Sequence, residues 1–278
     1  MLPARLVQTR TTRFEGRGRD IVVTAIWVSM AAALAAFVAG LFGLWLQRLL
    51  PKPHTSDRSR DMITAIVGLV SLLLALVLGT IIGSAYAFYS NQKTELETIA
   101  ARALQLDIAL AEFGPETKEA RAELKAGTQR VHDMFWGEKP IFDSDPGQLA
   151  PGTAIESLKA TDAAIAALDP RTPLQKQAAA AAVVDASLIQ NTRLSIALQL
   201  KSPVSWPLVT VVVLWSILLF CGFGMLSRIN ATTIAALGFG GFAVGSALFL
   251  IIELSQPYTG LFRVPPAALE QSIEAMGK

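Results

Sequence analysis

Four long stretches of the chain are apolar and carry almost no charge. They cover residues 21–46, 62–92, 203–226 and 229–253, and Glu253 at the end of the last stretch is their only charged residue. A helix that crosses a bilayer needs about 20 apolar residues, and each stretch reaches that length. Backbone groups in lipid are satisfied only in helices or closed barrels, and these stretches are too long for barrel strands. The pattern therefore predicts four transmembrane helices.

Polar segments divide these stretches into two hairpins. Residues 47–61 form a basic linker with prolines after the first stretch, and a short polar corner around Arg228 separates the third from the fourth. Residues 93–201 mix charged and apolar positions and predict a soluble helical domain between the hairpins. Residues 1–20 predict a basic N-terminal tail, and residues 254–278 predict a C-terminal tail. The predicted fold is an all-α membrane protein, with four transmembrane helices in two hairpins and an inserted soluble helical domain.

The second stretch is predicted to continue as one helix beyond its apolar part. Apolar residues follow it at alternating spacings of three and four, which is the repeat of a helix that packs on a partner. These seam residues are Leu96, Ile99, Ala103, Leu106, Leu110 and Phe113. Gly114 and Pro115 then end the helix, because proline lacks the amide proton that a continuing helix needs. Two later helix starts are predicted, one at a capping box formed by Thr153 and Glu156 and one at the start signal of Thr172, Pro173 and Gln175.

Composition and charge narrow the classes of function. Hydrophobic residues make up 52% of the chain and charged residues 17%, which is typical of a membrane protein. A net charge of +2 gives no reason to expect a nucleic-acid partner. The single cysteine, Cys221, excludes an internal disulfide and a thiolate metal cluster. The two histidines stand in no metal-binding or nucleophile motif. We therefore expect no enzyme activity, no metal site and no cofactor.

Glycines recur every four positions within two of the stretches. Gly79 and Gly83 share one helical face in the second stretch, and Gly241 and Gly245 do so in the fourth. Small residues at this spacing let membrane helices approach closely. The four glycines are therefore predicted to mark helix packing.

The second stretch also permits another interpretation. Its helix could line a pore along the axis of an oligomer, with Ile82, Tyr86 and Tyr89 narrowing that pore. The spacing of the residues alone does not choose between a packing face and a pore face. Both interpretations stay open.

Basic residues near the ends of the stretches predict the orientation of the chain. Five in the N-terminal tail and five more beside the stretches lie on the side of both tails and the soluble domain. Four in the 47–61 linker and Arg228 lie on the other side. Because loops rich in Lys and Arg stay in the cytoplasm, we expect a multi-pass protein of the cell (inner) membrane. Its termini and soluble domain are then cytoplasmic, and the lipid bilayer is a partner.

The fourth stretch ends in an acidic residue followed by a turn-forming phrase. Glu253 is predicted to lie at or just below the membrane surface, where a carboxylate is costly unless it is paired or hydrated. Pro257, Tyr258 and Gly260 follow it and predict a tight turn at the membrane boundary. Two interpretations of Glu253 stay open. It is either an ordinary helix end whose carboxylate reaches water, or part of an ion path or a subunit contact.

This closing phrase and the two hairpins resemble the bestrophin-like family, a bacterial and plant family of membrane proteins of unknown function. Glu253, Pro257, Tyr258, Gly260 and Val264 match the acidic residue, the proline–aromatic pair, the glycine and the valine that close that family's sequences. The family is remotely similar to the bestrophins, which are pentameric anion channels with a cytosolic helical domain. The resemblance implies a homo-oligomer that conducts inorganic anions. The acidic calcium-binding cluster of bestrophins has no match in the C-terminal tail, so calcium gating is not implied.

A second class of function stays open beside the channel. The chain could be a non-conducting membrane anchor or envelope sensor whose helical domain binds a protein partner. Ion conductance of the purified protein in a bilayer would separate the two classes.

Overall fold

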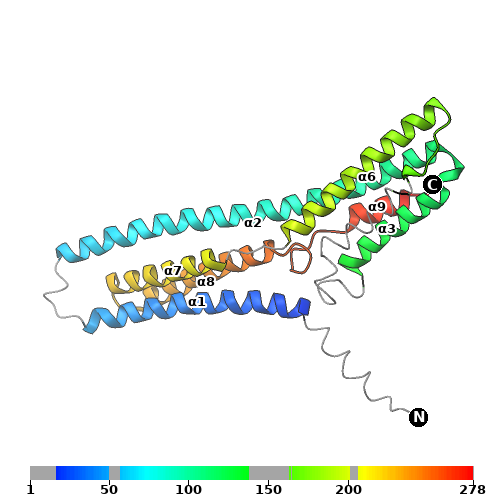
Figure 1. Ribbon diagram of the computed structural model, residues 1–278. Coiled ribbons are helices and arrows are strands. Elements are labelled where there is room, and N and C mark those ends of the chain that lie inside the picture. Colours follow the sequence, from blue (N-terminus) through cyan, green and yellow to red (C-terminus); the bar gives the residue numbers. More distant parts are fainter. Residues whose placement is uncertain (1–16, 50–56, 138–162, 164, 201–205, 278) are drawn as a thin grey trace, which may run out of the picture. The chain divides into compact units, whose positions relative to one another are not determined.

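The computed structural model describes residues 17–49, 57–137, 163, 165–200 and 206–277. The regular elements in these ranges are all helices (Figure 1). In chain order they are α1 Arg17–Leu49, α2 Asp57–Phe113, the 3-10 helix η3 Pro115–Thr117, α3 Lys118–Trp136, α6 Pro173–Gln199, α7 Trp206–Leu226, α8 Ala231–Leu254 and α9 Ala267–Ala275. The described part of the chain therefore has the predicted all-α fold.

Local sequence sets several of the helix ends. Thr172 caps α6, because its side chain accepts a hydrogen bond from the Gln175 N–H at 3.1 Å. The Gln175 side chain in turn accepts one from the Thr172 N–H at 3.2 Å, so this predicted helix start is confirmed. Asn230 caps α8 through a 2.6 Å bond from the Thr233 N–H to its side-chain oxygen. The predicted capping box at Thr153 lies outside the described residues.

The chain forms two compact units, and α2 contributes to both. The apolar unit consists of Asp20–Phe88 and Val204–Gln256. The polar unit consists of Tyr89–Pro203 and Pro257–Lys278, together with Met1–Arg19. The boundary between the units on α2 lies close to residue 92, where the second apolar stretch of the sequence ends.

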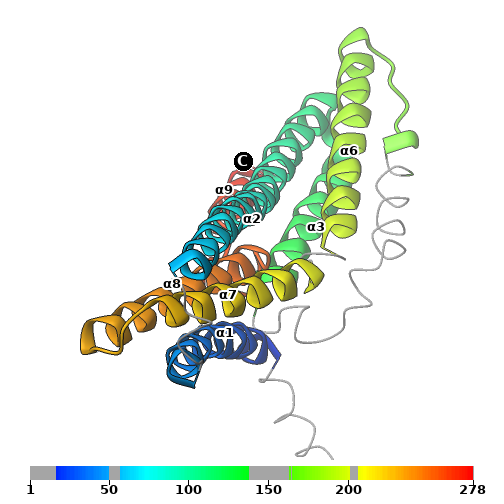
Figure 2. The same ribbon diagram turned by 90° about the vertical axis from the view of Figure 1, so that its left-hand side faces the viewer.

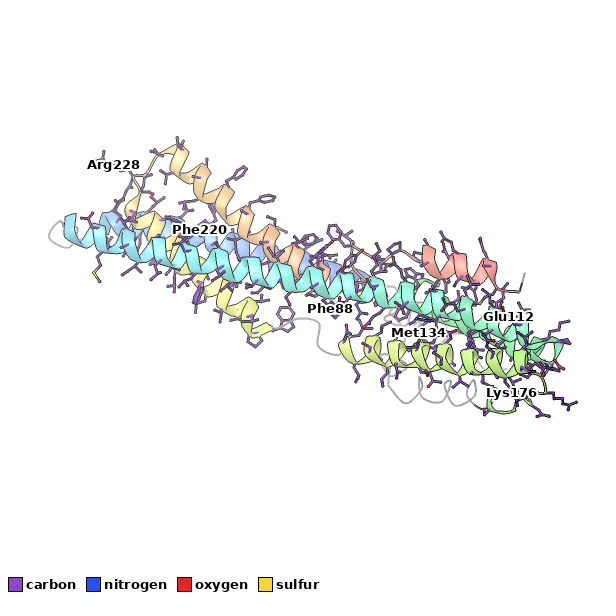
Figure 3. All side chains as sticks on the ribbon, turned by 90° about the horizontal axis from the view of Figure 1, so that it is seen from above. Phe88, Glu112, Met134, Lys176, Phe220 and Arg228 are labelled. Carbon is purple, nitrogen blue, oxygen red and sulfur yellow. The ribbon has the colours of Figure 1, made fainter. Side chains whose placement is uncertain are left out.

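In the apolar unit, α1, α7, α8 and the first part of α2 lie side by side around a hydrophobic core (Figures 1 and 2). Each of the four helices contributes buried side chains, among them Ala36, Leu74, Phe220 and Leu248. Figure 3 labels Phe220 on α7 and Arg228 at the corner that leads to α8. The two hairpins predicted from the sequence thus share one hydrophobic core.

The backbones of helices α1 and α7 approach each other closely at glycine residues. A Cβ atom added to Gly43 would collide with the carbonyl oxygen of Cys221, and one added to Gly224 would collide with that of Gly40. Such close approach is the usual role of small residues in membrane helices. The role of these glycines was not predicted, because Gly40 and Gly43 are three positions apart and do not follow the spacing of four that marks Gly79 and Gly83.

Four segments of the described helices are long and apolar enough to cross a membrane: Val23–Leu49, Asp61–Phe113, Trp206–Leu226 and Ala231–Leu254. They lie at the four predicted stretches. The helices α1 and α2 extend past the predicted limits of the first two stretches, because a helix does not end where its apolar run ends. It continues until a residue such as Pro115 stops it.

In the polar unit, the second part of α2 carries the predicted apolar seam. Its six seam residues, from Leu96 to Phe113, are each at most 4% exposed. Leu96 packs in a buried cluster with Val131 of α3, and Leu106 packs in another with Ala182 of α6. The prediction that this seam needs partner helices is therefore confirmed.

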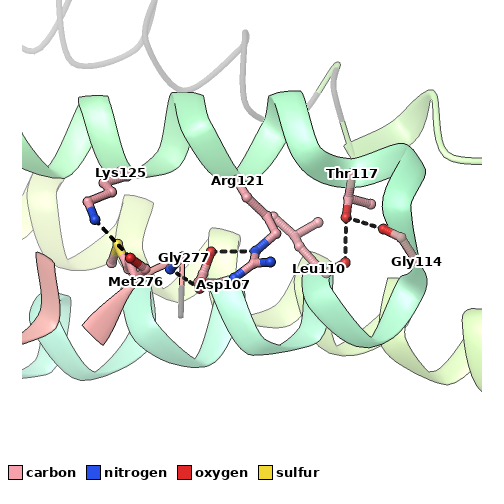
Figure 4. A network of polar contacts seen from close by, with 8 residues as sticks. All are labelled: Asp107, Leu110, Gly114, Thr117, Arg121, Lys125, Met276 and Gly277. Carbon is pink, nitrogen blue, oxygen red and sulfur yellow. Dashed lines mark hydrogen bonds and ion pairs between the residues drawn. The ribbon is translucent and has the colours of Figure 1, made fainter. Parts of the chain in front are cut away.

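The helix α9 lies in the segment that the sequence predicted only as a tail. The residues after it are bonded to α2 and α3 (Figure 4). Lys125 Nζ donates to the Met276 carbonyl oxygen at 2.8 Å, and the Gly277 N–H donates to Asp107 Oδ2 at 3.2 Å. Arg121 donates to both carboxylate oxygens of Asp107, each at 2.8 Å. The segment is therefore an integral part of the polar unit.

Candidate functional site

The apolar part of α2 is the least covered of the four candidate spans. In the most apolar 18 residues of each span, 11% of the residues are buried for α2, against 28% for α1, 39% for α7 and 33% for α8. Many of the exposed residues of α2 recur at spacings of three and four, and these share one face of the helix. They include Met62, Ile66, Leu69, Leu73, Leu76, Thr80, Gly83 and Ala87. This face of α2 is left open by the rest of the chain.

The open face changes character along its length. Its exposed residues from Met62 to Leu76 are mostly large and aliphatic, whereas from residue 79 they are small. We call this second part the small-residue face of α2: Gly79, Thr80, Gly83, Ser84 and Ala87. A Cβ atom added to Gly79 or Gly83 would meet no atom within 4 Å. Tyr86, which is 61% exposed, is the one large exposed side chain beside this face.

The three residues predicted to narrow a pore differ in their surroundings. Tyr86 is exposed beside the small-residue face. Ile82 is partly buried and packs against the core of the apolar unit. Tyr89 is partly buried and packs against a core cluster of the polar unit. Pore lining by these three residues stays a prediction, and Tyr86 is the one whose side chain is available to a pore without rearrangement of the chain.

The glycines predicted to mark helix packing also divide into two pairs. Gly79 and Gly83 face open space in the single chain. On α8, a Cβ atom added to Gly241 would lie 2.9 Å from the Ala33 carbonyl oxygen, and one added to Gly245 would lie 2.8 Å from that of Ser29. The α8 pair thus lies directly against the backbone of α1.

The closing phrase forms a second feature, the Tyr258 cluster, which lies in the polar unit. The Tyr258 side chain is 2% exposed and its ring stacks on Phe135, with ring centres 4.4 Å apart and an interplanar angle of 25°. Trp136 meets Tyr258 edge-on at 6.0 Å, and its indole N–H donates to the Val264 carbonyl oxygen at 3.1 Å. Burial raises the pKa of Tyr258, and the nearby Glu95 carboxylate raises it further. The hydroxyl therefore stays protonated and donates.

A chain of side-chain hydrogen bonds links Tyr258 to α2 and α6. The Tyr258 hydroxyl donates to Gln92 Oε1 at 3.1 Å, and Gln92 Nε2 donates to Gln199 Oε1 at 2.8 Å. Gln199 Nε2 then donates to Glu95 Oε1 at 2.9 Å, and the Ser195 hydroxyl donates to the same oxygen at 2.7 Å. Gln92 is 0% exposed. Water does not compete for its bonds, so the chain fixes α2, α6 and Tyr258 against one another.

The residues around Tyr258 form a closed loop. The Val264 N–H donates to the Pro257 carbonyl oxygen at 2.8 Å, which joins the two ends of residues 257–264. Pro257 and Gly260 are buried. Three of the residues predicted as a family motif, Pro257, Tyr258 and Gly260, thus belong to one tightly packed loop.

Glu253, the fourth residue of that motif, lies in the last turn of α8. It is 2% exposed within the apolar unit. Both interpretations of this residue, an ordinary helix end or a part of an ion path or a subunit contact, stay predictions.

Groups suited to metal binding are not found among the described residues. No three His, Cys, Asp or Glu side chains in that part of the chain come together as a possible ligand set. His132 Nδ1 lies 3.0 Å from the Asp133 carboxylate, and its ring stacks on Trp136 at 5.8 Å. Hydrogen bonds to His132 and Gln129 lower the pKa of Asp133. The histidine is therefore placed as a packing residue of α3.

Comparison with known proteins gives the family. A sequence model of the bestrophin-like domain matches residues 32–269 of the chain. The chain belongs to the bestrophin-like family. The crystal structure of a mutant form of a bacterial bestrophin homologue from Klebsiella pneumoniae has a similar fold, with a TM-score of 0.64. That match covers 91% of this chain and 97% of the homologue at 15% identity, so it shows the fold alone. A search of curated proteins found no match.

The bestrophin-like region contains both features described above, and its identification confirms the resemblance drawn from the closing phrase. The chain is accordingly a multi-pass membrane protein of this family. The sequence analysis missed Gln92, which links the closing phrase to α2. A signal was present: Gln92 stands four positions before Leu96, so it continues the buried seam with a polar residue.

Proposed function

We propose that the chain is one subunit of a homo-oligomeric channel that conducts inorganic anions. In this channel, the small-residue face of α2 and Tyr86 line the pore. The observation that carries the proposal is the open face of α2, which is the least buried of the four candidate spans. The membership of the bestrophin-like family and the fold of the bacterial homologue support it.

The character of the open face favours a pore along its second part. Large aliphatic side chains such as Leu69 and Leu72 suit contact with lipid tails. By contrast, Ser84 and Tyr86 place hydroxyl groups on an exposed helix surface, and in lipid such groups would lack hydrogen-bond partners from water. A water-filled pore would supply these hydroxyl groups with water as a hydrogen-bond partner. Gly79 and Gly83 of the same face, which precede Tyr86 along the helix, keep the pore wide before it.

The chemistry of this face suits anions in a neutral pore. No charged residue occurs from Met62 to Gln92, so no carboxylate repels an anion there. The Thr80 hydroxyl already donates to the Val77 carbonyl oxygen at 2.8 Å. Ser84 and Tyr86 are two apart and so lie on nearly opposite sides of the helix. If Tyr86 faces the pore, its hydroxyl is the neutral hydrogen-bond donor offered to an anion.

A single chain offers one such face, so the proposed pore needs several copies. Closed rotational symmetry brings the same face of each subunit to a common axis. Gly79 and Gly83 then allow the α2 helices to approach that axis closely.

The test is conductance of the purified protein in a planar bilayer under a chloride gradient. We expect an anion-selective current. Tyr86→Ala should raise the unitary conductance, because it removes the large side chain from the pore wall. Tyr86→Phe should keep the conductance and lower the preference for anions, because only the hydroxyl donor is lost.

Phe242→Ala is the matched control. Phe242 is an aromatic residue of α8 that is 70% exposed, and in the proposal it faces lipid. Its replacement should leave conductance and selectivity unchanged. Absence of current under every gradient would refute the channel and favour the alternative, a non-conducting membrane anchor or sensor that binds a protein partner. A current that responds equally to both alanine variants would place the pore elsewhere.

The proposal places the chain in the inner membrane, with the termini and the polar unit in the cytoplasm. The excess of basic residues on that side supports this orientation. It is tested in a Cys221→Ser background, where an impermeant thiol reagent added to intact cells should label Ser56→Cys and spare Ser144→Cys. The reverse labelling would invert the orientation without affecting the pore.

A further inference from the structure

The 257–264 loop presents apolar side chains outward from a rigid base. Its two ends are joined by the Val264 N–H to Pro257 carbonyl bond of 2.8 Å, and Tyr258 fixes it through Gln92. At its tip, Leu261 is 68% exposed and Phe262 is 48% exposed. The loop therefore holds an aliphatic and an aromatic side chain at the surface by means of a buried anchor.

The composition of the tip indicates what covers it. Leu261 and Phe262 are followed by the exposed cation Arg263. An apolar pair beside a basic residue is the pattern of a segment that lies in the interface of a membrane, where aromatic rings enter the headgroup layer and guanidinium groups meet lipid phosphates.

The position of the tip in the chain makes this environment reachable. Leu261 follows Leu254, the last residue of the candidate span α8, by only seven residues. An extended chain of that length reaches at most about 25 Å, and the end of a spanning helix lies at the membrane surface. The headgroup layer is therefore within reach of the loop.

The rigidity of the loop favours insertion. A flexible segment would lose conformational freedom when its side chains enter the bilayer, whereas a loop already closed and anchored loses little. Gly260, directly before Leu261, is buried, so the loop is packed up to the point where the exposed tip begins.

We propose that the 257–264 loop is a lipid-docking site, in which Leu261 and Phe262 enter the headgroup layer and Arg263 binds phospholipid phosphate. The site rests on the membrane placement of α8 and does not depend on whether the chain conducts ions.

The test is nitroxide labelling of the full-length chain in lipid nanodiscs, which is direct because Cys221 is the single cysteine. In a Cys221→Ser background, labels at Leu261→Cys and Phe262→Cys are compared with two references. Leu34→Cys, 59% exposed on α1, reports the bilayer, and Ile108→Cys, 50% exposed on the part of α2 in the polar unit, reports water. The two references have similar exposure in the chain and differ in their expected surroundings.

We expect the loop labels to collide more with oxygen and less with a water-soluble nickel complex than the Ile108 label does, as the Leu34 label should. Phe262→Ser should return the Leu261 label toward the Ile108 values. Nanodiscs with anionic phosphatidylglycerol should hold the labels deeper than nanodiscs of phosphatidylcholine alone, and Arg263→Gln should abolish this difference.

Two results would overturn the inference. Collision rates at the loop equal to those of the Ile108 label would mean that the tip lies in water. Immobile labels shielded from both oxygen and nickel would mean that protein, such as a neighbouring subunit, covers the tip. A loop that docks whether or not phosphatidylglycerol is present, with no effect of Arg263→Gln, would refute the role of Arg263.

Discussion

The hydrogen bond between Gln92 and Tyr258 gives the sharpest quantitative prediction. Gln92→Leu keeps the approximate volume of the side chain and removes its amide. The Tyr258 hydroxyl then loses its acceptor, and Gln199 Oε1 loses its donor. Each buried polar group left without its partner costs about 1–3 kcal/mol. We therefore expect Gln92→Leu to lower the free energy of unfolding of the polar unit by about 3 kcal/mol.

The second arm of the experiment is Tyr258→Phe. It keeps the stacking on Phe135 and leaves only Gln92 Oε1 without a donor, so we expect a loss of about 1–2 kcal/mol. In the double variant, Gln92→Leu with Tyr258→Phe, the two apolar groups face each other. The double variant should therefore be no less stable than Gln92→Leu alone, which corresponds to a coupling energy of about 1–2 kcal/mol.

The assay is thermal unfolding of the purified protein in detergent, followed by tryptophan fluorescence. A loss of 1 kcal/mol lowers the midpoint of a chain of this size by roughly 2–4 °C, so Gln92→Leu should lower it by about 6–12 °C. Gln105→Leu, on the exposed face of the same helix, is the matched control and should change it by less than about 2 °C. Equal shifts for Gln92→Leu and Gln105→Leu, or strictly additive effects in the double variant, would refute the reasoning.

Two further predictions concern pH and the glycines. Burial and Glu95 raise the pKa of Tyr258, so the stability that its protonated hydroxyl contributes is complete below about pH 10, the ordinary tyrosine value. That contribution is lost as the pH rises above this value. The unfolding midpoint should therefore fall less in alkali for Tyr258→Phe than for the unmodified chain, and an equal fall would contradict this. Gly245→Leu should destabilise the chain by about 2 kcal/mol through overpacking against α1, whereas Gly79→Leu should leave the unfolding midpoint unchanged and reduce the oligomer size measured by light scattering. An unchanged oligomer after Gly79→Leu would remove this residue from the subunit contact.

The parts of the fold that follow from periodicity could be predicted from the sequence. The run of apolar residues fixes where helices can cross a bilayer, and the seam from Leu96 to Phe113 fixes which side of α2 is buried. The capping box at Thr172 fixes one helix start to the residue. Each of these depends on interactions within one helix or on the solvent around it, which is the information that a local pattern contains.

The contacts between distant segments could not be predicted in the same way. The bond from Tyr258 to Gln92 joins residues 166 positions apart, and the close approach of Gly43 to the Cys221 backbone joins two separate hairpins. Neither pair has a spacing that links its members in the sequence. The same holds for α9, whose nine residues are too few for a strong periodic signal and whose burial depends on α3 and α2.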